Sequence, residues 1–186
     1  MIAWTDLLLP ALLAAVLVFL ASSVIHMVLK LHNPDYRKLP DEDAVREALR
    51  KGSPGPGQYI VPHCLDPKEM ADPAMQQRFE EGPVGVIYLR PTGMTKLGPF
   101  LGKWFVYTLV VGLIAGYVGR AALGPGAPYL DVFQVVGAAA WLGYAWSSPA
   151  ESIWKGVPWI VTVRTLFDGL VYAALTAGCY AWLWPG

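Results

Sequence analysis

Two charged residues inside an apolar stretch have the clearest capacity for chemistry in this sequence. The segment TVRTLFDGLVYAALTAG, residues 162–178, contains Arg164 and Asp168 four residues apart. On a helix this spacing places both side chains on one face, so that the guanidinium can neutralise the carboxylate. Because a lone carboxylate inside a membrane is costly, we expect an intramembrane ion pair near the inner boundary. A proton or ion pathway, and a salt bridge to another span or to a partner subunit, are the alternatives.

Histidine and cysteine form a second group of chemically capable residues. His26 lies near the end of the first apolar segment, and His32, His63 and Cys64 follow in a polar region. These residue types bind metals, but their spacing matches none of the HExxH, CxxC or HxH patterns. We therefore expect structural or solvated roles for His63 and Cys64, and a buried His26 bonded to a neighbouring span. The sequence implies no cofactor, and His32, His63 and Cys64 stay candidate metal ligands.

The composition indicates what kind of structure must position these side chains. Of the 186 residues, 55% are hydrophobic and 15% are charged, whereas soluble proteins carry about 25% charged residues. Eight Trp, nine Tyr and 19 Gly also suit a membrane protein, in which aromatic residues gather at the interfaces. The net charge is zero, which argues against nucleic acid as a partner. The expected partner is therefore a lipid bilayer.

Four segments have enough apolar residues to cross a bilayer, which takes about 20 residues. They are residues 7–29, about 99–118, about 130–146 and 158–184. The third is short and begins with two polar residues, Asp131 and Gln134. The sequence therefore predicts an all-α membrane protein, a four-transmembrane-helix bundle with a small α+β cytoplasmic insert between helices 1 and 2.

The distribution of basic residues predicts the orientation of these spans. Of the 14 lysines and arginines, all except Arg120 fall in the segment between the first two spans, in the turn near residues 147–157, or at the adjoining span ends. Basic residues near span ends stay in the cytoplasm. Both termini are therefore expected outside, with residues 30–98 in the cytoplasm.

Small residues recur at four-residue spacing in the last three predicted spans. In lipid, helices associate through close backbone approach, which small side chains allow. We therefore expect these residues to lie at helix–helix contacts within the bundle, or at contacts with another membrane subunit or a second copy of the chain. The residues are Gly112, Gly116, Ala139, Gly143, Gly169, Ala173 and Ala177.

The segment between the first two spans has a different character. LPDEDAVREALRKG and DPAMQQRFEEG read as short helices, whereas QYIVPHC and VGVIYLR read as strands. The sequence thus predicts three parts, a first span at 1–29, an insert at 30–98 and a three-helix region at 99–186. SSPAESIWKGVPW adds a short interfacial helix near 148–156, with Pro149 in the first turn and Gly156 as the stop.

Three stretches resemble a group of small bacterial polytopic membrane proteins. They are HNPDYRKLPDEDAVREALRKGSPGPGQY, MQQRFEEGPVGVIYLRPTG and SIWKGVPWIVTVRTLFDGLVYAALTAG. The likeness extends over most of the chain and implies a location in the bacterial inner membrane. It implies no activity, because none is assigned to the group.

Three functions are consistent with these patterns. We expect a non-enzymatic accessory or assembly subunit that acts through protein–protein interaction. One alternative is a small transporter or channel that uses Arg164, Asp168, Asp131 and Gln134. The other is a membrane-bound metal-dependent enzyme that uses His26, His32, His63 and Cys64.

Overall fold

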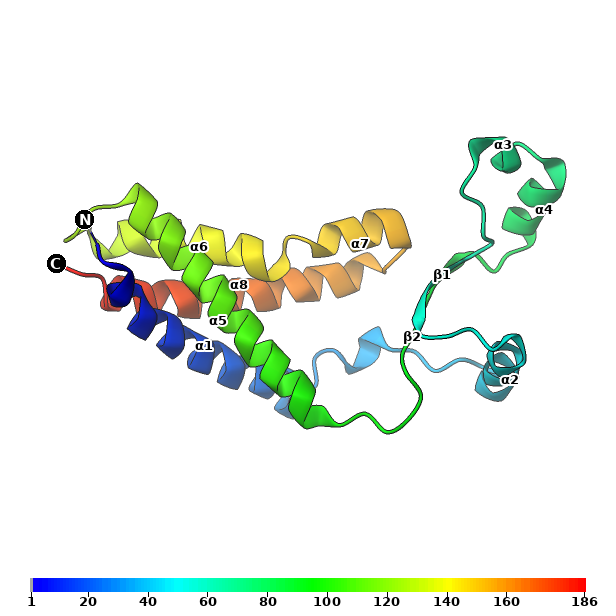
Figure 1. Ribbon diagram of the computed structural model, residues 1–186, viewed down its shortest axis with the longest axis horizontal. Coiled ribbons are helices and arrows are strands. Elements are labelled where there is room, and N and C mark those ends of the chain that lie inside the picture. Colours follow the sequence, from blue (N-terminus) through cyan, green and yellow to red (C-terminus); the bar gives the residue numbers. More distant parts are fainter. Residues whose placement is uncertain (1) are drawn as a thin grey trace. The chain divides into compact units, whose positions relative to one another are not determined.

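The computed structural model describes residues 2–186 (Figure 1). The chain forms two compact units. The first contains the residues up to Asp35 together with Lys96–Ser152 and Val157–Gly186, and the second contains Tyr36–Thr95 and Ile153–Gly156. Most of the chain is helical, and the second unit adds a small two-stranded sheet.

Three helices of the first unit are long and apolar enough to cross a membrane, so this is a membrane protein. They comprise Trp4–Val28, Leu97–Ala122 and Trp159–Trp182, with mean hydropathies of 2.6, 1.6 and 1.4. The first consists of α1 (Leu8–Ser23) between a 3₁₀ turn and a π-helical turn, and the other two are α5 and α8.

The remaining predicted span also forms a helix, α6 (Tyr129–Ala145), but it has only 17 residues. At 1.5 Å per residue this is about 25 Å, short of the roughly 30 Å of a bilayer's hydrocarbon. Among the described residues it is therefore not one of the three helices that meet the length of a span. A short helix, α7 (Ser148–Lys155), follows directly where the sequence predicts an interfacial helix.

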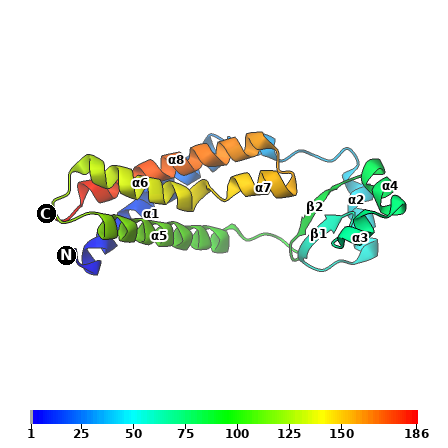
Figure 2. The ribbon, with the colours of Figure 1, turned by 90° about the horizontal axis from the view of Figure 1, so that it is seen from above.

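The four helices of the first unit pack in adjoining pairs. Helix α1 contacts α5 and α8, and α6 contacts the same two helices (Figures 1 and 2). The core between them is built mostly from small and β-branched side chains, among them Ala11, Val18, Val136 and Ala140, all fully buried. Such side chains allow close approach of helix backbones, the main source of helix association in lipid.

Several of the predicted small residues lie at these contacts. A Cβ atom added to Gly116 would lie 2.4 Å from the hydroxyl oxygen of Tyr180, and one added to Gly169 would lie 2.3 Å from the Cβ of Ala145. Gly143 faces Val111 in the same way. Gly112, also on α5, lies against Ala11 of α1, and its distances leave room for ordinary contact. Ala173 and Ala177 are buried and Ala139 is half-buried.

The two chain ends meet at one end of the first unit. The Arg120 Nε–H donates to the carbonyl of Ile2 at 2.7 Å, and the Trp184 Nε1–H donates to the carbonyl of Gly124 at 3.0 Å. The start of α1, the end of α5, the start of α6 and the end of α8 are thereby held together. The opposite end of the unit contains the end of α1, the start of α5 and the start of α8.

The second unit contains the elements that the sequence predicts for the insert. Strand β1 (Gly57–Val61) pairs antiparallel with β2 (Gly85–Leu89), with Tyr59 opposite Ile87. The helices are α2 (Glu42–Gly52), α3 (Pro67–Met70) and α4 (Pro73–Glu81). Aspartates begin all three helices, because the carboxylates of Asp41, Asp66 and Asp72 each accept a backbone N–H of the first turn.

Candidate polar site at the end of helix α1

Five charged or ionisable side chains gather at the end of the first unit where α1 stops. They come from three places in the chain, namely His26 at the end of α1, His32 and Asp35 in the segment that follows, and Arg164 and Asp168 on α8. All five residues belong to the first compact unit. The cluster therefore joins α1 to the first turns of α8.

A change of helix type positions His26. After Ser23 the helix continues as a π-helix over Val24–Val28, and π-helical turns are rare and often found at functional sites. The His26 Nδ1–H donates to the carbonyl of Ser22 at 3.0 Å. The side chain is 49% exposed, so the expected burial of His26 is wrong, while its Nε2 lies 3.8 Å from Asp168 of the neighbouring span α8. Its polar partner on Nδ1 belongs to its own helix.

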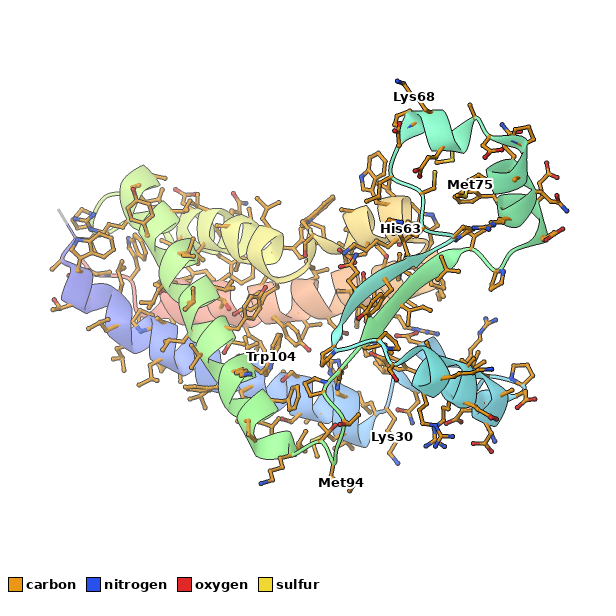
Figure 3. All side chains as sticks on the ribbon, turned by 45° about the vertical axis from the view of Figure 1, so that its right-hand side comes forward. Lys30, His63, Lys68, Met75, Met94 and Trp104 are labelled. Atoms are coloured by element: carbon orange, nitrogen blue, oxygen red, sulfur yellow. The ribbon has the colours of Figure 1, made fainter. Side chains whose placement is uncertain are left out.

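A sharp reversal of the chain positions His32. Lys30 adopts φ +52, a left-handed conformation that is uncommon for residues other than glycine, and it is labelled at the end of α1 in Figure 3. A 3₁₀ turn at Asn33–Asp35 then begins. As a result the His32 ring stacks on the His26 ring, with centroids 4.6 Å apart and planes 4° from parallel.

Two buried carboxylates flank the His32 ring. The Asp168 Oδ2 lies 2.7 Å from the His32 Nε2 and 3.8 Å from the His26 Nε2. On the other side of the ring, the Asp35 Oδ2 lies 2.7 Å from the His32 Nδ1. The side chains of Asp35 and Asp168 are only 4% and 7% exposed. Arg164 pairs with the second oxygen of Asp35, Oδ1.

These contacts differ from the ion pair that the sequence suggests. Arg164 and Asp168 are one helical turn apart on α8, but in the described residues their ion-pair partners are Asp35 and the two histidines. The reason is geometric, because the segment after α1 brings a carboxylate and an imidazole between the two α8 side chains. The contact comes nearest to the alternative of a salt bridge from Arg164 to another span, although Asp35 lies in the segment after the first span and not in a span.

The arrangement around His32 requires an additional cation. A neutral imidazole has one N–H, while both ring nitrogens of His32 face a carboxylate oxygen at hydrogen-bond distance. Without another positive particle, a nitrogen lone pair would face an oxygen lone pair at 2.7 Å. A second proton on the ring, a proton on one carboxyl group, or a metal ion would resolve this conflict. The site is thus built to hold a positive charge between Asp168 and the histidines.

Two aromatic side chains, those of Trp104 and Tyr172, lie next to the cluster. Ser22, whose carbonyl binds His26, also accepts the Trp104 Nε1–H on its hydroxyl at 2.9 Å. Trp104, labelled on α5 in Figure 3, packs edge-on against Tyr172, one turn after Asp168. Tyr172 is buried, and within residues 2–186 its hydroxyl has no hydrogen-bond partner. Beyond Tyr172 the buried polar groups among the described residues are uncharged hydroxyls, including those of Tyr144 and Thr176.

The other candidate residues lie elsewhere. His63 is exposed and Cys64 is buried, and both belong to the second unit, where Figure 3 labels His63. Asp131 and Gln134 are exposed on the first turns of α6, at the end of the first unit that holds the chain termini. The structure thus brings together His26, His32, Arg164 and Asp168 from the residues singled out in the sequence.

Asp35 is the member of the site that the sequence analysis did not identify. It follows His32 by three residues in HNPD, a spacing that a tight turn brings onto one side. That motif opens the first stretch on which the resemblance to bacterial membrane proteins rests, and it was the signal in the sequence that could have identified Asp35.

The chain matches no protein-family model, no curated protein and no solved structure.

Proposed function

We propose that this protein is an accessory or assembly subunit of the bacterial inner membrane, which holds its second unit at the membrane to bind another protein. The observation that carries the proposal is the lack of a core in the second unit. Within the described residues 36–95, Cys64 is the single buried residue. A chain of this size normally buries about 60% of its surface on folding. In this proposal, the second unit buries its remaining apolar surface against a partner protein.

The exposed apolar side chains of this unit indicate where that partner binds. Leu65 is 75% exposed and Met94 is 95% exposed. Ile60 within β1 is 41% exposed, and Val84, directly before β2, is 59% exposed. Exposed apolar groups at this density are typical of protein-interaction surfaces. The two-stranded sheet also leaves the outer edge of each strand unpaired in the described residues, and open edges accept further strands.

The first unit serves as the anchor in this proposal, with four spans and both termini outside. The meeting of the chain ends through Arg120 and Trp184 supports an even number of crossings. The short helix α6 lies alongside α8 over its length and counts as the fourth crossing. The basic residues around the insert support a cytoplasmic second unit. An alkaline phosphatase fused after Gly186 should be active, and an inactive fusion would contradict this orientation.

Site-specific photocrosslinking tests the interaction. A photoreactive side chain is placed at Leu65 or Ile60 in the full-length protein in its native membrane, and at the exposed Lys51 of α2 as a control. A discrete protein adduct should form at Leu65 and Ile60 and be at least several-fold weaker at Lys51. Adducts with lipid alone at all three positions would refute the interaction role.

A metal-dependent role is the second candidate, and one observation favours it. His26, His32 and Asp168 place their potential ligand atoms within 4.8 Å of one another. A transporter or channel has less support. Asp131 and Gln134 lie at one end of the first unit, and Arg164 and Asp168 lie toward the other end.

A further inference from the structure

We propose that His26, His32 and Asp168 bind a divalent first-row transition-metal ion, with Zn²⁺ and Fe²⁺ as the best-suited ions. This site is independent of the interaction role proposed above, since it lies in the first unit and involves none of residues 36–95. Three kinds of observation carry the inference. They are the hydrogen bond at the Nδ1 atom of each histidine, the convergence of the three ligand atoms, and the charges around them.

The hydrogen bonds on the far side of each histidine leave both Nε2 atoms directed toward Asp168, where a metal ion would replace the present contacts. The His26 Nδ1–H donates to the carbonyl of Ser22, which can only accept. The His32 Nδ1 contacts the carboxylate of Asp35 at 2.7 Å. Metal-binding histidines nearly always donate their second N–H to a carbonyl or a carboxylate in this way, which fixes the tautomer and the direction of the ring. Both kinds of supporting contact occur here.

The two Nε2 atoms converge on one carboxylate oxygen. The Asp168 Oδ2 lies 3.8 Å from the Nε2 of His26 and 2.7 Å from that of His32. Two ligands held at about 2.0–2.1 Å by a tetrahedral ion are about 3.3 Å apart. The observed separations lie on either side of this value. The two rings are stacked with planes 4° from parallel, so the half-exposed His26 ring must rotate before both Nε2 lone pairs point at one ion beside Asp168.

The charges of the site attract a cation. The two buried carboxylates carry two negative charges if ionised, and Arg164 supplies one positive charge. Uncompensated charge in a buried position is strongly unfavourable. A metal ion at Nε2 of His32 replaces the hydrogen that otherwise bridges this atom to Asp168. It removes the lone-pair conflict, and the charges of the two carboxylates, Arg164 and the dication then sum to +1.

The donor set selects the kind of metal. Two imidazoles and one carboxylate suit zinc and also form the facial triad of non-haem iron sites. Calcium and magnesium prefer oxygen ligands only, and copper(I) prefers sulfur. Three protein ligands leave at least one coordination position open. The half-exposed His26 provides the approach for the ion and for a water molecule in that position.

Cobalt(II) titration of the full-length protein in detergent tests the site. The protein, without a histidine tag, is stripped of metal with a chelator and titrated with Co²⁺, whose visible absorption reports nitrogen and oxygen ligation. One Co²⁺ per chain should bind and be displaced by Zn²⁺. His26→Ala should raise the Kd at least tenfold, and Asp35→Asn should raise it about 10- to 100-fold, as for other outer partners of a ligand.

His63→Ala is the matched control, because His63 is exposed and lies outside the cluster. Its Kd should equal that of the unchanged protein. His26→Ala is the decisive variant, since a half-exposed side chain can be removed without loss of the fold, which size-exclusion chromatography verifies. No saturable Co²⁺ absorption in the unchanged protein would overturn the proposal, as would an unchanged Kd in folded His26→Ala. In either case a proton alone fills the position beside Asp168.

Discussion

His32 and Asp168 are 136 residues apart in the sequence and share a hydrogen bond of 2.7 Å. This contact fastens the segment after α1 to the first half of α8, and the pairing of Asp35 with Arg164 fastens it a second time. The polar residues of α8 are therefore not paired with each other along their own helix. They hold the segment through which the chain leaves the first unit for the second.

The first prediction concerns which charges are coupled. In a double-mutant cycle, Arg164→Ala and Asp35→Ala should show a coupling energy of about 1 kcal/mol, because the two groups are in direct contact. The cycle of Arg164→Ala with Asp168→Ala should give a smaller value. The measurement is thermal unfolding in detergent. A larger coupling between Arg164 and Asp168 would restore the ion pair that the four-residue spacing suggests.

The second prediction compares two buried tyrosines of α8. The Tyr180 hydroxyl donates to the carbonyl of Gly112 at 2.9 Å, so Tyr180→Phe should lower the free energy of unfolding by about 1 kcal/mol. The Tyr172 hydroxyl has no partner among the described residues, so Tyr172→Phe should leave stability unchanged or raise it. Chemical denaturation of the two variants in one detergent makes the comparison. Equal losses would show that the Tyr172 hydroxyl is also hydrogen-bonded, for example to water.

The third prediction concerns the contact of α5 with α8. Gly116→Ala places a methyl group 2.4 Å from the hydroxyl of Tyr180, which is completely buried. Overpacking of this kind costs about 1–3 kcal/mol. Gly102→Ala is the control on the same helix, because a Cβ there meets nothing within 4 Å. It should raise stability slightly, since alanine favours helix over glycine by about 1 kcal/mol. Similar effects of both changes on the thermal midpoint would contradict the close packing at Gly116.

The fourth prediction concerns the reversal at Lys30, where φ is +52. Lys30→Gly should be neutral or stabilising by up to about 1 kcal/mol, because glycine adopts this conformation without a steric penalty. Lys30→Val should destabilise the first unit, since a β-branched residue strongly disfavours positive φ. Lys103→Val, on α5, is the control for replacing an exposed lysine. The thermal midpoint is the readout, and equal effects of valine at both positions would argue against the reversal.

The sequence predicts the elements of this protein better than its site. Apolar runs of sufficient length predict α1, α5 and α8, and β-branched clusters predict β1 and β2, because each signal is local. The site depends on contacts between distant segments and on two local irregularities. These are the π-helical turn around His26 and the positive φ of Lys30. Neither irregularity can be recognised from the residue types. A glycine would have indicated a positive φ at the reversal, but the residue at this position is a lysine.

The local spacing of Arg164 and Asp168 led the prediction toward a pair within one helix. The geometry that a sequence makes available is the periodicity of the helix itself. The partners that the structure provides are Asp35 and His32, which the chain delivers from the end of α1. Polar residues in an apolar segment thus indicate where charged side chains gather, while the identity of their partners depends on the fold.

The π-helical turn at Val24–Val28 has a consequence for how the length of this chain can vary. Each residue of an α-helix turns the side-chain direction by about 100°, and a π-helical turn absorbs one surplus residue without shifting the helix before it. The turn therefore behaves as a one-residue insertion near His26. A homologous chain that lacks one of residues 24–28 would keep its hydropathy profile and its membrane span. Its histidines would no longer face each other. The presence or absence of this one residue would therefore distinguish chains that keep both the membrane span and the site from chains that keep only the span.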